Sequence, residues 1–205
     1  MELLVWVRIP VGTHVMKKLI LASQSLGRRK VLEDAGFVFE VFPSNYIEDM
    51  TLPLLPHELA THLSRGKAQD VAQKNPEAIV IGADTFVVYE GKLLGKPLTK
   101  ENARKMLKLL SGSVHAMLSG LTVIHAGREI TKLVETKIWF KSFSEKEIDE
   151  YVETGESLEK AGGYAYQGVG KKFVERIEGS ETNILGLPIE VLKEVLQEFG
   201  VAVLK

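Results

Sequence analysis

Cysteine is absent from the 205-residue sequence. The chain therefore forms no disulfide bond and no thiolate metal site, so a bound metal would need oxygen or imidazole ligands. A chain without cysteine is compatible with a reducing compartment. We expect a cytoplasmic protein.

An excess of charge of one sign is also absent. The chain has 26 Lys and Arg residues against 27 Asp and Glu residues, which gives a formal net charge of -1. Surfaces that bind nucleic acids carry clustered positive charge, so we expect no nucleic-acid partner. The basic cluster at residues 28–30 is the alternative, but Glu33 and Asp34 follow it closely.

Long hydrophobic runs are missing too. The apolar start is interrupted by Arg8 and Pro10, and no basic region precedes it. It therefore predicts neither a signal peptide nor a membrane anchor. A second plausible start is Met16, and no Pro-, Gly- or Ser-rich tract divides the chain after it. We predict an N-terminal extension at residues 1–15, which is either an extra strand or an upstream-start extension with no role, and a single domain over residues 16–205.

Short apolar runs alternate with helical patterns along the rest of the chain. Strand-like runs lie at residues 19–22, 37–42, 78–83, 121–125 and 138–140. Helical spacing of apolar residues predicts helices at 28–35, 57–74, 99–110, 144–151 and 188–199. The pattern predicts an α/β domain with a central twisted sheet flanked by helices. The close spacing of strand candidates between residues 113 and 140 indicates antiparallel pairing, so we expect the sheet to be mixed.

The first strand leads directly into a polar segment that opens a helix. Hydroxyls of Ser23 and Ser25, backbone N–H groups and the guanidinium group of Arg28 could converge there on an anion. This arrangement is typical of phosphate binding. The simpler alternative is that Ser25 caps the helix and the arginines are solvated.

Asp84 follows the strand predicted at residues 78–83. In α/β proteins ligands usually lie at the carboxyl ends of strands, where an aspartate can bind a metal or orient a water molecule. The alternative is a turn aspartate that hydrogen-bonds to its own backbone. Two later segments are candidates for nucleotide contacts.

In these segments Lys96 stands between Gly95 and Pro97, and Gln167 lies in a glycine-rich run at residues 161–170. A lysine in a restrained loop suits a phosphate, and an amide can hydrogen-bond to the edge of a base. A solvated lysine and a plain glycine-rich loop are the alternatives.

Seven motifs occur along the chain in the same order as in Maf proteins. They read LILASQS, the arginine pair, VIGADT, GKLLGKP, LEKAGGYAYQG, FVERIEG and NILGLP. From Met16 to the C-terminus the chain resembles the Maf family of nucleoside triphosphate pyrophosphatases. The resemblance implies an α/β fold related to inosine triphosphate pyrophosphatases. It also implies hydrolysis of a nucleoside triphosphate to the monophosphate and pyrophosphate.

The resemblance also implies site residues. Asp84 matches the catalytic acid of the family and Glu48 its essential glutamate, while Lys67, Lys96 and Gln167 match further functional positions. We expect Asp84 to activate water and to share a Mg²⁺ or Mn²⁺ ion with Glu48. An exposed position in the middle of a helix is the alternative for Lys67. By analogy with the family, we expect a homodimer.

Position 27 departs from the family pattern. Where the family has Ser-x-Ser-Pro-Arg-Arg, Leu26 and Gly27 replace the proline and the first arginine, so Arg28 matches the second arginine. Thr85 and Gln167 match the dTTP/UTP branch, which makes dTTP and UTP the expected substrates. The alternatives are 7-methyl-GTP or a broad range of modified nucleotides and, in another class, a non-catalytic nucleotide-binding regulator of cell division.

Overall fold

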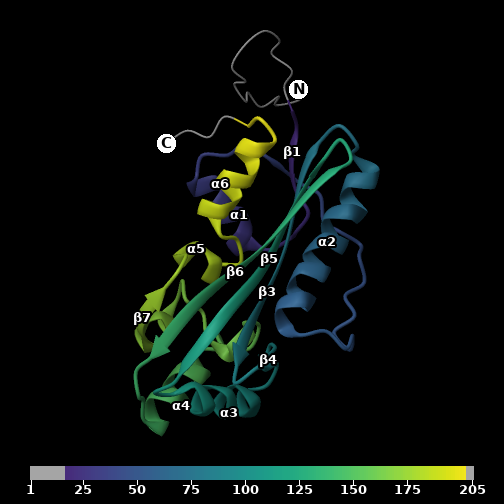
Figure 1. Ribbon diagram of the computed structural model, residues 1–205. Coiled ribbons are helices and arrows are strands. Elements are labelled where there is room, and N and C mark those ends of the chain that lie inside the picture. The colour runs from purple at the N-terminus through teal and green to yellow at the C-terminus, as the bar shows by residue number, and fades with distance from the viewer. Residues whose placement is uncertain (1–16, 202–205) are drawn as a thin grey trace.

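The computed structural model describes residues 17–201 as one α/β domain with a mixed sheet (Figure 1). The predicted extension at residues 1–15 lies outside the described residues. The strands are β1 (Leu19–Leu21), β2 (Glu40–Val41), β3 (Ile79–Tyr89), β4 (Lys92–Leu94), β5 (Val114–His125), β6 (Arg128–Phe140) and β7 (Val174–Glu178). The sheet order is β2-β1-β3-β5-β6-β7, and β4 pairs with β3. Pairing is parallel for β1 with β2 and β3, and antiparallel elsewhere. The predicted fold class is confirmed.

Helices cover both faces of the sheet. They are α1 (Leu26–Asp34), α2 (Pro56–Lys74), α3 (Lys100–Leu110), α4 (Glu145–Glu153), α5 (Glu181–Ile184) and α6 (Ile189–Glu198), with short 3-10 segments η1 (Ala161–Gly163) and η2 (Val169–Phe173). In Figure 1, α2 lies on one side of the long strands and α1 and α6 lie on the other, while α3 and α4 gather at the far end. Among residues 17–201, no helix combines the length and the apolar character that crossing a bilayer requires.

Side chains alternate across the faces of β3, so successive residues pack into different hydrophobic clusters on its two faces. Ile79, Ile81 and Ala83 pack with residues of α1 and α6. Val80 packs under α2 in a second cluster, and Phe86 packs under α2 in a third. Asp84, which has the same parity as Val80 and Phe86, therefore faces α2.

The five predicted long helices are confirmed to within two residues at each end, whereas the strands differ more. The sequence predicted only the last residues of β5 and β6, and it missed β4 and β7. One face of β6 carries the exposed residues Leu133, Glu135 and Lys137, while Thr136, Ile138 and Phe140 on the other face are buried. A half-exposed antiparallel strand alternates polar and apolar residues, so a search for continuous apolar runs finds only part of it.

The predicted position of Asp84 at the end of a strand is wrong. Asp84 lies in the middle of β3 and pairs with Gly120 of β5. The polar side chain of Asp84 does not end this strand, because a side chain of α2, described below, neutralises its carboxylate. The rule that ligands lie at the carboxyl ends of strands applies instead to β1, the parallel neighbour of β3. The chain leaves the sheet at residue 22, directly after β1 ends.

Candidate active site

A gap in strand pairing opens the edge of β3 beside Asp84. On this edge, β1 pairs with β3 as far as Ile81, and β4 pairs with it from Val87 onward. In the described part of the chain, no strand pairs with residues 82–86 on this side. Groups from both faces of the sheet can therefore approach Asp84 around the open edge.

Two glycines set α2 close to the sheet on the face of Asp84. A Cβ atom at Gly82 would lie 2.5 Å from the backbone oxygen of Ser64, and one at Gly120 would lie 2.7 Å from the backbone nitrogen of Thr61. The missing side chains let the helix backbone approach the strands closely. This contact places Lys67 of α2 over Asp84.

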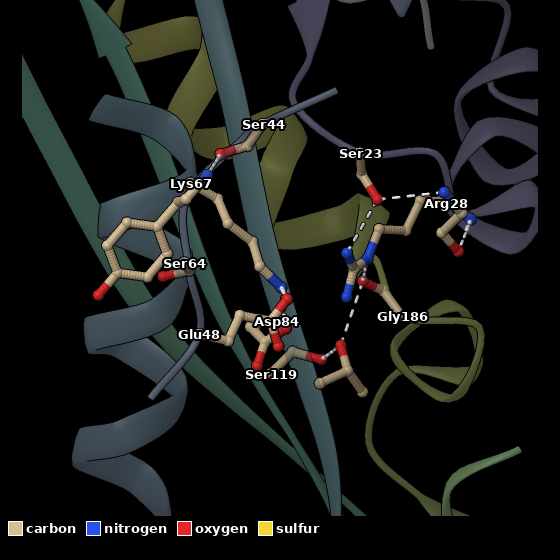
Figure 2. Close-up of polar contacts among 12 residues, drawn as sticks. Ser23, Arg28, Ser44, Glu48, Ser64, Lys67, Asp84, Ser119 and Gly186 are labelled. Carbon is tan, nitrogen blue, oxygen red and sulfur yellow. Dashed lines mark hydrogen bonds and ion pairs between the residues drawn. The ribbon is translucent and has the colours of Figure 1, made fainter. Parts of the chain in front are cut away.

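Lys67 connects the two predicted catalytic carboxylates (Figure 2). Its Nζ donates to Oδ1 of Asp84 in a very short contact, and it lies 2.8 Å from Oε1 of Glu48. The side chain of Lys67 is only 11% exposed, which excludes the alternative of a solvated lysine. The structure thus brings together Glu48, Lys67 and Asp84, which lie far apart in the sequence.

Asp84 is a buried carboxylate in a strongly charged environment. Burial raises the pKa of Asp84 above its ordinary value, the charges of Lys67 and Arg28 and the hydrogen bond from Lys67 lower it, and the charge of Glu48 raises it again. Its second oxygen, Oδ2, is buried and has no hydrogen-bond partner among the described residues. A buried oxygen without a partner is costly, so Oδ2 is suited to receive a cation or a water proton.

Arg28 reaches the site from α1 on the other side of β3 (Figure 2). Its Nη1 donates to Oγ of Ser23 and its Nε donates to the backbone oxygen of Gly186, both at 3.0 Å. Ser25 is the N-cap of α1, with Oγ 3.4 Å from the backbone nitrogen of Arg28. The alternative of a capping serine is therefore right for Ser25, whereas Arg28 is held by specific contacts rather than solvated.

The guanidinium group of Arg28 has only neutral oxygens as close partners. Within residues 17–201, no carboxylate lies within ion-pair distance of it. Burial lowers the pKa of Arg28, while the charges of Asp84 and Glu48 act in the opposite direction. Because arginine stays protonated at neutral pH, its positive charge is available for an anion.

Thr85 lies on the opposite face of β3 from Asp84 and joins the Arg28 side. Its Oγ1 is 2.7 Å from Oγ of the buried Ser119 and 3.3 Å from the backbone oxygen of Gly186. The oxygen of Gly186 therefore links Thr85 to Arg28. Ser119 and Gly186 were not predicted, because Ser119 has no distinguishing sequence pattern and the only signal for Gly186 was its place in the NILGLP motif.

Gly27 has a packing role in this chain. An ideal Cβ atom at position 27 would lie 2.8 Å from the backbone oxygen of Leu185. The glycine thus lets α1 contact the turn that contains Gly186. A residue with any side chain at this position requires the turn or the helix to shift.

Two predicted substrate contacts lie apart from this cluster. Lys96 is exposed and pairs with Glu159 at 3.2 Å. Gln167 is exposed in the turn before η2. In the hydrogen bonds and ion pairs of residues 17–201, neither contacts Asp84, Lys67 or Glu48, so their roles stay predictions.

The donor set limits the kind of metal site. The described residues contain no group of three or more His, Asp or Glu side chains placed to hold an ion. Glu48 and Asp84 supply two carboxylates, one with an unpartnered buried oxygen. Mg²⁺ is commonly bound by one or two carboxylates together with substrate phosphates and water, so these residues fit such an ion.

Comparisons with known proteins identify the family of this chain. A family model described as Maf-like protein matches residues 18–199. A dTTP/UTP pyrophosphatase of Bacillus pumilus (strain SAFR-032) is 45% identical over 186 residues, covering 91% of this chain and 98% of that protein. One of Methanosarcina barkeri (strain Fusaro / DSM 804) is 44% identical over 191 residues, covering 92% and 97%. The chain belongs to the Maf-like protein family.

Proposed function

We propose that this protein is a nucleoside triphosphate pyrophosphatase that hydrolyses dTTP and UTP to the monophosphate and pyrophosphate. The observation that carries the proposal is the division of charge around Asp84. On one side Arg28 offers a positive charge held by neutral oxygens, and on the other two carboxylates converge on Lys67. A metal-bound triphosphate needs both an anion site and a cation site, close together.

The chemistry assigned to the chain's own residues is positioning and proton transfer. Asp84 accepts the proton of the water that attacks the α-phosphorus, as the bond to the departing pyrophosphate breaks. Arg28 holds phosphate oxygens with its planar fork, and Ser23 and Ser25 add hydroxyl contacts. Lys67 neutralises charge that develops on the phosphates.

A divalent cation, Mg²⁺ or Mn²⁺, would be held by Glu48 and Asp84. When bound, it would neutralise the triphosphate and lower the pKa of coordinated water. Lys67 lies between the same two carboxylates. Metal binding at this place therefore requires the ammonium group to move toward the phosphates.

The preference for pyrimidine triphosphates rests on the names of the relatives and on Thr85 and Gln167. Gly27 lacks the side chain that the family's dTTP/UTP branch has there, so 7-methyl-GTP and other modified nucleotides are the competing substrates. A non-catalytic regulator of cell division is the candidate from another class. The retained cluster of Asp84, Lys67 and Glu48 favours the enzyme.

The test compares the wild type with Asp84→Asn on dTTP, UTP, CTP, GTP, 7-methyl-GTP and 5-methyl-UTP, with Mg²⁺ or Mn²⁺. Removing the proton acceptor should lower kcat by about 10³-fold, within the usual range for general acid–base catalysis. Pyrophosphate and monophosphate are both quantified, and circular dichroism checks the fold. A folded wild type that turns over none of these nucleotides would favour the regulator.

The raised pKa of Asp84 gives a second test of its role. Only the deprotonated carboxylate accepts a proton, so the protonation of Asp84 is followed by NMR in the metal-free protein, because a bound cation lowers the pKa of a carboxylate that holds it. In the metal-free protein Asp84 should titrate above the ordinary aspartate pKa of about 3.9, and adding Mg²⁺ should lower its pKa. Titration of Asp84 in the ordinary aspartate range without metal would contradict the buried position on which the assignment rests.

We keep three further predictions for this protein. Its substrate is a nucleotide of the cell interior, which supports a cytoplasmic location. The near balance of charge supports the absence of a nucleic-acid partner. A homodimer is proposed by family analogy, and sedimentation of the purified chain would test it.

A further inference from the structure

The segment that carries Glu48 has no regular secondary structure, yet Glu48 must be placed accurately beside Asp84. Residues 43–48, which we call the Glu48 segment, run between β2 and α2 and lie along α2. The side chain of Glu48 itself is 44% exposed and its one ion pair among the described residues is with Lys67. Its position therefore depends on how the rest of the segment is attached.

Polar contacts attach the first part of the segment to Asp70 of α2. Its Oδ2 accepts hydrogen bonds from the backbone nitrogen of Asn45 at 2.7 Å and from Oγ of Ser44 at 3.1 Å. Oδ1 of the same carboxylate accepts from Lys74 at 2.7 Å. Both oxygens of Asp70 are thus in use, and its direction is fixed.

An aromatic ring attaches the next residue to Gly66. A Cβ atom at Gly66 would lie 2.5 Å from Cε2 and 2.7 Å from Cε1 of Tyr46. The ring of Tyr46 therefore occupies the space that any other residue at position 66 would fill. The hydroxyl of Tyr46 also lies 3.1 Å from Nε2 of His62.

The three contacts form one stripe on α2. His62, Gly66 and Asp70 are separated by four residues each and so share one face of the helix. Lys67, which binds both Glu48 and Asp84, follows Gly66 directly in the same helix. The helix α2 thus carries both the residues that hold the Glu48 segment and the lysine between the carboxylates.

From this arrangement we infer that Gly66 and Tyr46 are positioning residues, which set the place of Glu48 through the packing of the ring on the helix. This inference rests on the proposed function, because it assigns Glu48 to the metal-dependent site. A helix interior normally disfavours glycine relative to alanine. The glycine at position 66 is therefore explained by the ring that it admits and not by the helix.

The experiment uses Gly66→Ala in the full chain. The added methyl group should displace the ring of Tyr46 and with it Glu48, weakening Mn²⁺ binding about 10-fold, as is usual when support of a metal ligand is lost. Mn²⁺ is measured directly by electron paramagnetic resonance and as its activation constant in dTTP turnover. The unfolding midpoint should change little, because the higher helix propensity of alanine offsets the lost packing of the ring.

Four further variants separate positioning from a general structural effect. Tyr46→Phe keeps the ring and should bind Mn²⁺ within about twofold of the wild type, since only one exposed hydrogen bond is lost. Tyr46→Ala should weaken binding as Gly66→Ala does, and the double variant should be no worse than Tyr46→Ala, because the two residues share one contact. Gln69→Ala, an exposed change in the same helix, is the matched control.

Unchanged Mn²⁺ binding in Gly66→Ala would overturn the inference, as would additive effects in the double variant or no Mn²⁺ binding by the wild type. Failure of the proposed function appears differently, as a wild type that binds Mn²⁺ but releases no pyrophosphate from any nucleotide. The direct Mn²⁺ measurement tests the positioning role in either case.

Discussion

The two sides of the site hold their cationic side chains in opposite ways. On the α1 side, Arg28 contacts only neutral oxygens, those of Ser23 and Gly186. On the α2 side, Lys67 contacts two carboxylates, Glu48 and Asp84. The α1 side therefore presents unneutralised positive charge, whereas on the α2 side one ammonium group lies between two carboxylates, which leaves an excess of negative charge.

This difference assigns the parts of a metal-bound triphosphate to separate places. Phosphate oxygens suit the α1 side, where a guanidinium group can grip two of them. In the proposed function a divalent cation would lie on the α2 side, held by Glu48 and Asp84 in place of the ammonium group. Asp84 lies in the open edge of β3 between the two sides, where the reacting phosphorus is expected.

Replacing Lys67 removes the positive charge between the two carboxylates of the α2 side. Of the replacements that test the two sides, it should have the largest effect. Lys67→Met leaves two carboxylates without their counter-ion, and losing one partner of a buried ion pair costs about 3 kcal/mol or more of unfolding free energy. We expect a loss close to about 3 kcal/mol and not a larger one, because Glu48 is half-exposed. The measurement is chemical unfolding of the metal-free protein.

Mn²⁺ should partly restore the stability of Lys67→Met, because the cation can replace the missing ammonium group. The control is Lys67→Arg, which keeps the positive charge. If Mn²⁺ raises the stability of Lys67→Met no more than that of the wild type, the α2 side is not the place of the metal.

Replacing Arg28 tests the α1 side. Arg28→Lys keeps the charge but loses the planar fork, so KM for dTTP should rise about 10-fold, equivalent to one charge-assisted hydrogen bond. The activation constant for Mn²⁺ should stay unchanged, because the metal is assigned to the other side. Arg29→Lys is the matched control, since Arg29 is exposed and pairs with Glu33. An equal rise in KM for dTTP and in the activation constant for Mn²⁺ would contradict the assignment of phosphate and metal to different sides.

Much of the α1 side could be predicted from the sequence, because its signals are local. A serine that follows a strand and precedes a helix predicts a cap, and Ser25 caps α1 as an N-cap should. The neighbouring Arg28 then follows at the start of the helix. What the sequence could not supply is the partner from the far end of the chain, Gly186.

The α2 side depends on contacts between distant segments, so the sequence predicted less of it. Resemblance to the Maf family predicted Glu48, Lys67 and Asp84 as site residues. Local patterns placed Asp84 at a strand end and did not exclude an exposed position for Lys67. Gly82 and Gly120 look ordinary in sequence. Their role appears only when α2 lies across the two strands.

Gly27 allows the smallest and most specific test of the α1 side. In Gly27→Ala the new Cβ atom meets the backbone oxygen of Leu185, so the turn should move and Arg28 should lose its bond to Gly186. One ordinary hydrogen bond is worth about 1 kcal/mol, or about fivefold in KM for dTTP. Leu26→Ala, a change at the exposed preceding residue, is the control.

Because the obstruction begins at Cβ, Gly27→Arg should raise KM at least as much rather than restore the pattern of the family. A Gly27→Arg variant with lower KM for dTTP would show that the turn yields, and that the missing arginine alone limits the pyrimidine preference.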